Sequence, residues 1–325
     1  MNEFENFIKK INDAKNIVIF THTIPDGDAI GSSFGLASAL KKLNKNVCVV
    51  LQDKILDEYT YFNLDEFLKY EVPENVDLMI STDCPILDRI GKFSAQFKDF
   101  PNTVAIDHHI SFESFAKLNY VNSNSSSACE FLYDIFNECR IPIDKQVAEF
   151  IYLGILRDTG GFMHSSTTPS TFRATADLLE KGVDLENINR HFMLTTTLKT
   201  TLLLKTALEN LIMSNYGKIA ISTISSQELK QNNAKVENTG GIIGNLLAIN
   251  TVEVAILITE VQPNVHKVSI RTKKLDANDI AKDFGGGGHK KASGCQMYGQ
   301  KNKVLNALLK SAESRLLKSE EVRLL

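Results

Sequence analysis

A short stretch near the N-terminus, His22-Thr-Ile-Pro-Asp-Gly-Asp28, brings together one imidazole and two carboxylates. It follows the apolar run 17–20 and precedes a helical pattern that begins near Ala29. Imidazole and carboxylate groups are metal ligands, and the end of a strand that leads into a helix is where α/β proteins place their chemistry. The alternative is an ordinary turn in which Asp28 caps the following helix.

Three later stretches favour the metal site. Asp83 ends the apolar run 77–83, and Asp107-His108-His109 end a second run that starts at Thr103. Asp158 ends a helical pattern that Asp144 is expected to cap. The residues gathered in this way are His22, Asp26, Asp28, Asp83, His108 and Asp158.

Four carboxylates in one cleft would repel each other strongly, and divalent cations relieve such repulsion. Six protein ligands are too many for one catalytic ion with open positions, but they suit two ions that share a carboxylate. Two such ions activate a bridging water and stabilise the oxygens of an in-line phosphoryl displacement. Nitrogen and oxygen ligands without a thiolate favour Mn²⁺, ahead of Mg²⁺, Co²⁺ or Zn²⁺.

A second chemical feature is the glycine run 285–288, which His289, Lys290 and Lys291 follow directly. Consecutive glycines can turn their backbone N–H groups toward an anion, so the run predicts a phosphate-binding loop. A flexible linker is the alternative. Arg271 could reach the same pocket, or it could be an ordinary solvated arginine.

The remaining candidates are less specific. Asp107 could orient a ligand histidine or itself coordinate a metal. His164 could touch the substrate or be a plain loop residue, and His191 and His266 are expected at the surface or in a connector. The five cysteines are interpreted as small buried apolar residues.

The elements that must position these groups alternate between strands and helices. Apolar runs at 17–20, 47–51, 77–83 and 103–107 predict strands of a parallel sheet. The C-terminal part predicts strands at 218–224, 252–261 and 267–272, with helices around 241–249, 277–284 and 304–317. Pro169 and Gly182 are expected to start and stop one further helix.

The fold class predicted is therefore α/β. A doubly wound, mainly parallel N-terminal domain covers 1–188, a helical connector covers 189–211, and a smaller α/β domain with a mixed sheet covers 212–325.

Composition bounds the function classes. The chain has 325 residues, 43% of them hydrophobic, which is enough for about two domains at ~150 residues each. The net charge of −3 argues against a protein that coats long nucleic acid through bulk charge. Five cysteines without a CxxC pair, no signal peptide and no apolar run of ~18 residues predict a cytoplasmic protein without a membrane span.

Taken together, the motifs resemble the DHH phosphoesterases. The matching residues are His22-x-x-Pro25-Asp26-Gly27-Asp28-Ala29-x-Gly31-Ser32, Asp83, Asp107-His108-His109 and Asp158-Thr159-Gly160. The glycine run with His289, Ala292 and Gly294 is similar to the DHH-associated C-terminal domain of that family. Length and this second domain make the chain most similar to the bifunctional oligoribonuclease and pAp phosphatase (nano-RNase A-like) subgroup.

The resemblance implies a role for each residue. One Mn²⁺ would take His22, Asp26 and Asp83, and a second would take Asp28, Asp83, His108 and Asp158, so that Asp83 bridges the two. The catalytic residues would be His109, Asp107 and Asp83. His109 would face the scissile phosphate, and Asp107 would orient His109. The substrate's terminal nucleotide or phosphate would be held by Arg271, Gly286, Gly287, Gly288 and His289. Cys129, where threonine is common, and His164, where aromatic residues are frequent, depart from the family pattern.

The implied function is a two-metal exonuclease that degrades RNAs of about two to five nucleotides to mononucleotides and also removes the 3′-phosphate of pAp. Two alternatives remain at this point. One is a hydrolase of pApA or pyrophosphate-type substrates, and the other is a non-catalytic nucleotide sensor. A homodimer is left open.

Overall fold

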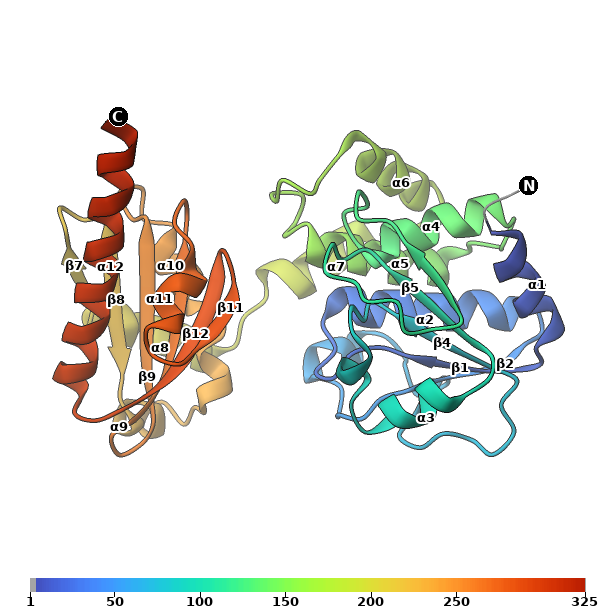
Figure 1. Cartoon of the computed structure of the whole chain (residues 1–325), viewed down its shortest axis with the longest axis horizontal. Helices are drawn as coiled ribbons and strands as arrows, with labels where there is room; N and C mark the ends of the chain where they lie inside the picture. The colour runs from blue at the N-terminus through green and yellow to red at the C-terminus, as the bar shows by residue number, and fades with distance from the viewer. Residues whose placement is uncertain (1–3, 325) are drawn as a thin grey trace. The chain divides into compact units, whose positions relative to one another are not determined.

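The structure is a computed structural model that describes residues 4–324, arranged as two compact units that divide between Thr195 and Thr196 (Figure 1). The predicted connector, 189–211, spans this division, and the predicted domains also include residues 1–3 and 325, which lie outside the described chain. None of the described helices is long and apolar enough to cross a membrane.

The first unit is built on a six-stranded parallel sheet. Its strands are β1 (Asn16–Phe20), β2 (Asn46–Val50), β3 (Leu68–Lys69), β4 (Leu78–Thr82), β5 (Thr103–Asp107) and β6 (Leu118–Val121). The strand order is β3-β2-β1-β4-β5-β6, and every pairing is parallel. Chain connections therefore run in opposite directions from β1 and from β4, which creates the switch point where open α/β sheets hold ligands.

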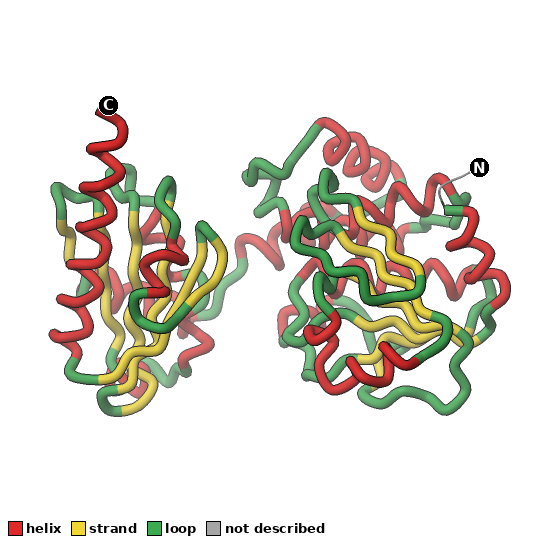
Figure 2. Tube along the Cα trace, in the orientation of Figure 1, coloured by secondary structure: helices red, strands yellow, loops and turns green. Residues whose placement is uncertain are grey.

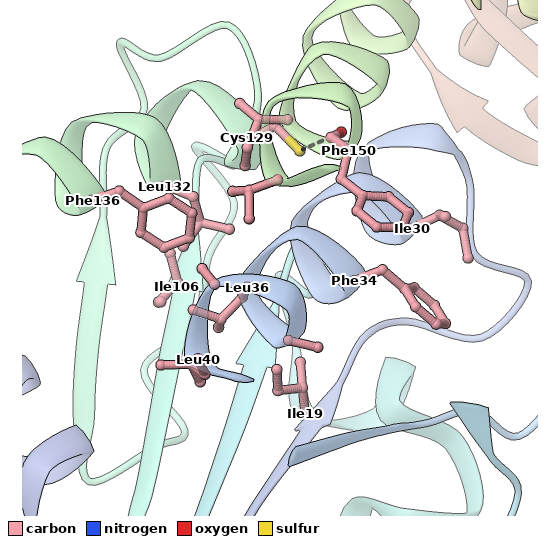
Figure 3. Close-up of a cluster of buried hydrophobic side chains, with 14 of the residues drawn as sticks. Ile19, Ile30, Phe34, Leu36, Leu40, Ile106, Cys129, Leu132, Phe136 and Phe150 are labelled. Atoms are coloured by element: carbon pink, nitrogen blue, oxygen red, sulfur yellow. Dashed lines mark hydrogen bonds between the residues drawn. The ribbon is translucent and has the colours of Figure 1, made fainter. Parts of the chain in front are cut away.

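Helices cover both faces of this sheet because its strands are apolar on both sides. One face packs against α1 (Glu5–Asp13), α2 (Gly27–Lys42), α4 (Ala128–Glu138) and α5 (Lys145–Asp158). Figure 3 shows Ile19 and Ile106 of the sheet beside Phe34 of α2, Leu132 of α4 and Phe150 of α5. The other face packs against the 3₁₀ helix η2 (Leu87–Phe93) and α3 (Ser94–Asp99). The predicted doubly wound arrangement is confirmed.

Three further elements close the first unit. They are α6 (Pro169–Glu180), α7 (Leu185–Asn189) and a π-helical turn, η3 (Arg190–Leu194). Pro169 opens α6, and Gly182 follows its end with a left-handed φ of 93°, as the sequence predicts. A second 3₁₀ helix, η1 (Asp57–Tyr61), lies between β2 and β3.

The second unit is built on a mixed six-stranded sheet. Its strands are β7 (Ile212–Ser214), β8 (Ile219–Ile224), β9 (Val254–Gln262), β10 (Val265–Thr272), β11 (Gly287–His289) and β12 (Ala292–Tyr298), in the order β11-β12-β10-β9-β8-β7. Only β8 and β9 pair in parallel among the described strands of this sheet. The predicted mixed sheet is thus confirmed. Figure 2 shows the strands of both sheets in yellow and the helices beside them in red.

Helices also cover both faces of the second sheet. One apolar cluster joins the sheet to α11 (Ala277–Lys282) and α12 (Lys301–Leu324). Another joins it to α8 (Leu198–Glu209), α9 (Ser226–Gln231), the 3₁₀ helix η4 (Val236–Thr239) and α10 (Ile242–Leu247).

The sheets contain strands that the sequence does not predict. β6 and β7 are short strands at sheet edges, and β12 carries alanine, serine and glycine where apolar alternation would be expected. The glycine run also differs from the loop expected, because Gly287, Gly288 and His289 form β11 and pair with β12. Glycine and small polar residues have low strand propensity, so tertiary pairing decides here.

Candidate metal centre

The predicted metal ligands gather at the carboxyl ends of the central strands of the first unit. His22 follows β1, Asp83 follows β4, and His108 follows β5. Asp28 lies in the first turn of α2, and Asp158 is the last residue of α5. Side chains from four separate parts of the chain are thereby brought together at the switch point of the sheet.

One group of possible ligands is formed by His22, Asp26 and Asp83. Nε2 of His22 lies 3.8 Å from Oδ2 of Asp26 and 3.8 Å from Oδ2 of Asp83. The His22 ring is oriented by its other nitrogen, because Nδ1 lies 2.8 Å from the carbonyl oxygen of Thr23. The separations are too long for hydrogen bonds but suit donor atoms that share one ion at bonds of ~2.1 Å.

A second group is formed by Asp28, His108 and Asp158. Nε2 of His108 lies 3.7 Å from Oδ2 of Asp28 and 3.5 Å from Oδ2 of Asp158. Its Nδ1 faces the carbonyl oxygen of Ser125 at 3.4 Å, so Nε2 again points into the group. A ring nitrogen directed by a backbone carbonyl is the usual support of a metal-binding histidine.

Asp83 lies next to both groups of possible ligands. Its Oδ2 faces His22, while its Oδ1 lies 3.7 Å from Nε2 of His108. The residue is buried and has a left-handed φ of 52°, with its amide bonded to the carbonyl oxygen of Ile106. Oδ1 has no hydrogen-bond partner among the described residues. A buried carboxylate oxygen without a donor is costly, and a shared cation is one way to satisfy it.

The charges of the group reinforce this fit. Burial raises the pKa of Asp83 well above its usual range, and the neighbouring carboxylates of Asp28 and Asp26 raise it further. Burial, followed by the charges of Asp28 and Asp26, also raises the pKa of Asp158 to about 8. Without cations the carboxylates would hold protons near neutral pH, whereas bound divalent cations would favour the ionised form. The donor set and its electrostatics therefore fit two divalent ions.

Asp26 has a different environment, because it is exposed and caps α2. Its Oδ1 accepts hydrogen bonds from the amides of Asp28 and Ala29, both at 3.1 Å. Desolvation acts to raise the pKa of Asp26, but the interaction with His22 and these two amides lower it to about 2. The sequence suggested Asp28 as a possible cap, whereas Asp26 performs this role and leaves the Asp28 carboxylate free for the group.

The Asp28 carboxylate is held by the start of α4. Oδ2 accepts a hydrogen bond from the amide of Ala128 at 2.6 Å, and Oδ1 accepts one from the amide of Cys129 at 3.0 Å. Gly154 of α5 makes room for this contact, since a Cβ there would lie 2.5 Å from Oδ1 of Asp28 and 2.2 Å from Sγ of Cys129. Cys129 also contacts the carbonyl oxygen of Phe150 (Figure 3).

Asp107 and His109 form a pair at the edge of the group. Oδ1 of buried Asp107 accepts from the His109 amide at 2.6 Å and lies 2.8 Å from His109 Nδ1. Burial alone would lower the pKa of His109, but the hydrogen bond and charge of Asp107 raise it above its ordinary value. His109 Nδ1 also lies 3.6 Å from Oδ1 of Asp83, so the histidine borders the shared carboxylate.

Arg157 lies beside the group, although the sequence analysis does not single it out. Its Nη1 donates to the carbonyl oxygen of Phe192 at 2.7 Å, and its Nη2 lies 3.5 Å from Glu58. It lines a cavity of about 180 Å³ with Asp26, Asp28 and other residues, namely Gly27, Asp158 and Met193. The only sequence signal is a basic residue next to Asp158 at a helix end.

The predicted substrate-binding residues all lie in the second unit. Arg271 of β10 pairs with Ala292 of β12, and Ala292 pairs in turn with His289 of β11. Directly paired residues of antiparallel strands share a face, so Arg271 and His289 lie on one face with a small alanine between them. The sequence suggested that both residues could serve one pocket, and this placement is compatible with that suggestion.

The glycine amides differ from the predicted phosphate-binding loop. Gly285 and Gly286 donate to the carbonyl oxygens of Lys282 and Ala281, and Gly288 donates to Oδ1 of Asn278. These three amides already have hydrogen-bond partners within the unit, whereas a phosphate-binding loop would turn such amides toward the anion. The role of Gly286, Gly287, Gly288 and His289 in substrate binding stays a prediction.

The other histidines also have defined places. Exposed His164 lies against Gly160, with its Nδ1 3.1 Å from the carbonyl oxygen of Asp158, so it borders the metal group. His191 contacts the carbonyl oxygen of Glu58. The expectation of a surface or connector position is wrong for His266, which is buried in β10 between β9 and β12, with Nε2 2.9 Å from the Gly299 carbonyl oxygen.

Two of the five cysteines are only partly buried, namely Cys139 and Cys295, while Cys48, Cys84 and Cys129 are buried as expected.

A larger cavity, of about 520 Å³, lies around η1 and β3 and shares no lining residue with the metal group. The cluster of possible metal ligands, and not the size of a cavity, therefore marks the candidate site.

Both units contain a segment that matches a known protein family. Residues 16–155 match the DHH family, N-terminal domain, and residues 217–318 match the DHHA1 domain. The chain is 28% identical to a probable bifunctional oligoribonuclease and PAP phosphatase, NrnA, of Streptococcus mutans over 92% of this chain and 94% of that protein.

The chain is also similar to two other proteins. A crystal structure of an exopolyphosphatase-related protein from Bacteroides fragilis is 28% identical and superposes with a TM-score of 0.87 over 96% of this chain and 95% of that one. A probable manganese-dependent inorganic pyrophosphatase of Streptococcus thermophilus is 31% identical, over 52% of this chain and 57% of that protein.

Proposed function

Since the chain belongs to the DHH family of phosphoesterases and carries a DHHA1 domain, we propose that it hydrolyses very short oligoribonucleotides to mononucleotides and removes the 3′-phosphate of pAp. The observation that carries the proposal is the arrangement of two ligand groups around one shared carboxylate, Asp83. The similarity to the S. mutans protein along nearly its whole length supports the choice of substrates.

In this proposal, His22, Asp26 and Asp83 hold one divalent ion, and Asp28, Asp83, His108 and Asp158 hold the other. When bound, two such ions supply an activated water and stabilise the charge that develops on the phosphate. Mn²⁺ is the proposed metal, because the donors are nitrogen and oxygen only and the S. thermophilus relative is named as manganese-dependent.

His109 acts next to these ligands. Asp107 holds Nδ1 of His109, which directs Nε2 away from that carboxylate. The hydrogen bond and charge of Asp107 raise the pKa of His109, which favours its protonated form, and we expect Nε2 to face a non-bridging oxygen of the scissile phosphate. Asp107 therefore positions His109 and stabilises its protonated form.

Arg271 and His289 are proposed to hold the terminal nucleotide or phosphate of the substrate. Their shared face on the second sheet places two cationic or hydrogen-bonding groups on either side of Ala292. Long strands normally require an extended cationic groove with stacking platforms, which a chain of net charge −3 does not suggest. RNAs of about two to five nucleotides fit such a limited contact better.

A pyrophosphate-type substrate is the second candidate. It is favoured by the pyrophosphatase relative, whose similarity spans about half of each chain. The hydrolysis chemistry would be the same, and only the group held beyond the scissile phosphate would differ.

The test compares Mn²⁺-dependent hydrolysis of a labelled RNA trimer, pAp, pApA, pyrophosphate and an RNA 24-mer. We expect rapid release of mononucleotide from the trimer, with slower or no attack on the 24-mer. Asp83→Asn keeps the shape of the shared ligand but removes its charge, and should lower turnover by at least ~10²-fold. Asp99→Ala, at an exposed position of α3, is the control and should keep wild-type activity.

Pyrophosphate as the preferred substrate would replace the oligoribonuclease assignment by the second candidate. Mn²⁺-dependent binding of a dinucleotide without turnover of any substrate would instead support the sensor and contradict the proposal.

A further inference from the structure

Glu130 is a buried carboxylate that the proposed chemistry does not use. It lies in the first turn of α4 and is 2% exposed. Its Oε2 accepts hydrogen bonds from the amide of Ser126 at 3.0 Å, from the Ser126 hydroxyl, and from the Thr171 hydroxyl at 2.8 Å. Its Oε1 accepts from the Ser170 hydroxyl at 2.7 Å. Both oxygens are thus satisfied by groups from two separate segments.

The first of these segments supports two of the possible metal ligands. The carbonyl oxygen of Ser125 faces Nδ1 of His108, and the amides of Ala128 and Cys129 hold the Asp28 carboxylate. Ser127 lies between them and caps α4 by accepting from the amide of Glu130 at 2.9 Å. Glu130 therefore holds the stretch 125–129 in two ways. Its carboxylate accepts from Ser126, and its amide donates to the capping hydroxyl of Ser127.

The second segment is the start of α6, which follows Asp158 along the chain. Asp158 ends α5, the loop 159–168 comes next, and Ser170 and Thr171 lie in the first turn of α6. Thr171 also completes the capping box with Thr168 at the end of that loop. The Glu130 carboxylate thus connects two segments. One is the stretch 125–129, which supports Asp28 and His108, and the other is the start of α6, which follows the loop after Asp158.

We infer that Glu130 is a positioning residue for the metal position formed by Asp28, His108 and Asp158, and that it has little effect on the position formed by His22, Asp26 and Asp83. This rests on the proposed two-ion function. The position formed by His22, Asp26 and Asp83 is supported by other contacts, namely the Thr23 carbonyl on His22 and the α2 amides on Asp26. Partners that orient metal ligands typically change metal affinity by ~10–100-fold when they are removed.

The role follows from hydrogen-bond acceptance and not from direct contact with an ion. Glu130→Ala removes the acceptor and leaves the Ser126 amide unpaired in a buried place, so the 125–129 stretch should shift. Glu130→Gln keeps one acceptor oxygen, and its amide group can donate to the Ser170 hydroxyl, which can reverse its role. The conservative variant should therefore restore the position that the alanine variant disturbs.

The experiment measures Mn²⁺ binding to the full chain by calorimetric titration, with free Mn²⁺ followed by electron paramagnetic resonance. Wild type should bind two ions. Glu130→Ala should bind one of them ~10–100-fold more weakly and the other within about twofold of wild type. Glu130→Gln should bind both within about threefold of wild type.

Double variants identify the weakened position. Adding Glu130→Ala to His108→Ala should cause little further loss beyond that of His108→Ala alone, because both act on one position, whereas adding it to His22→Ala should weaken both positions. Tyr152→Phe is the stability control, since it removes a buried hydrogen bond to Asn189 in the same unit without touching the metal group. Its two Mn²⁺ affinities should stay at the wild-type values.

If Glu130→Ala does not fold, Ser170→Ala and Thr171→Val each remove one of the hydrogen bonds and should weaken the same position by a smaller factor. The inference is overturned if these variants bind both ions as wild type does, or if they weaken both positions equally. A wild-type protein that binds no Mn²⁺ would overturn the two-ion function itself, which separates the two failures.

Discussion

At the scale of single residues, the metal group depends on positions that carry no ligand. Gly154 is the clearest case, because α5 passes so close to Asp28 and Cys129 that no Cβ fits between them. No motif in the sequence singles out Gly154, and its importance follows from the packing of α5 against Asp28 and Cys129. A glycine inside a helix costs about 1 kcal/mol relative to alanine, so a close contact is a physical reason for it.

Gly154→Ala should therefore displace the Asp28 carboxylate and weaken Mn²⁺ binding at the position that Asp28 shares with His108. Overpacking of this kind costs about 1–3 kcal/mol, offset in part by the better helix propensity of alanine. Calorimetric Mn²⁺ titration and thermal unfolding measure both effects.

The matched control is Gly244→Ala in α10, where a Cβ would meet nothing within 4 Å. That variant should be neutral or slightly stabilising. Unchanged Mn²⁺ affinity of Gly154→Ala would show that the Asp28 carboxylate tolerates a shift, contrary to this expectation.

The gathering of the candidate ligands could be predicted from the sequence, because each lies shortly after a buried strand, at the start of a helix or at its end. Their supports could not. The hydrogen bonds to Asp28 come from residues 100 and 101 positions away, and the network at Glu130 joins α4 to α6. Contacts of this kind depend on tertiary packing, which no local pattern of residue types reports.

At the scale of elements, the strongly apolar strands and capped helices match the sequence expectation, whereas the short edge strands do not. β1, β4 and β5 are buried almost throughout, so hydrophobicity identifies them. β6 and β11 are partly or fully exposed and gain their conformation from a neighbouring strand. Edge strands of few residues lack the alternation that sequence patterns detect.

The start of α5 contributes to stability through its cap, whereas its last residue, Asp158, is a candidate metal ligand. Asp144 accepts from the amide of Val147 at 3.1 Å, as its position before the helix predicts. Asp144→Ala should lower the free energy of unfolding by about 1 kcal/mol, which corresponds to about 2–4 °C in a unit of this size. Mn²⁺-dependent turnover should not change, because Asp158 lies at the opposite end of α5.

Asp144→Ser supplies another capping oxygen and should recover most of the lost stability, as measured by thermal unfolding. A loss of turnover in Asp144→Ala at temperatures where the variant is fully folded would contradict the separation of the two helix ends.

At the scale of the whole molecule, each unit has its own sheet and apolar clusters, and among the described residues the possible metal-ligand groups all lie in the first unit. The folded state raises the pKa of Asp158 to about 8 and that of Asp83 well above its usual range, mainly through burial. In the unfolded chain both carboxyl groups would titrate near ~4. Between about pH 4 and pH 8 the metal-free folded protein therefore binds more protons than the unfolded chain.

Stability then falls as pH rises through this window, because the folded state must give up protons that it holds more tightly than the unfolded chain does. We expect the melting temperature of chelator-treated protein to fall between pH 5 and pH 8. With saturating Mn²⁺ the trend should weaken or reverse, since metal binding requires the ionised carboxylates and stabilises the folded state in proportion to its affinity. Differential scanning calorimetry at several pH values, with and without Mn²⁺, measures both trends.

The Asp83→Asn variant provides the decisive comparison for this prediction. It removes a carboxyl group whose pKa burial raises, so the folded variant has one proton fewer to give up as the pH rises. The metal-free variant should therefore lose less stability than wild type between pH 5 and pH 8 and should gain less from Mn²⁺. A metal-free wild type whose melting temperature rises over the same range would mean that the carboxylates are already paired without a cation, and the electrostatic argument for two metal ions would fail.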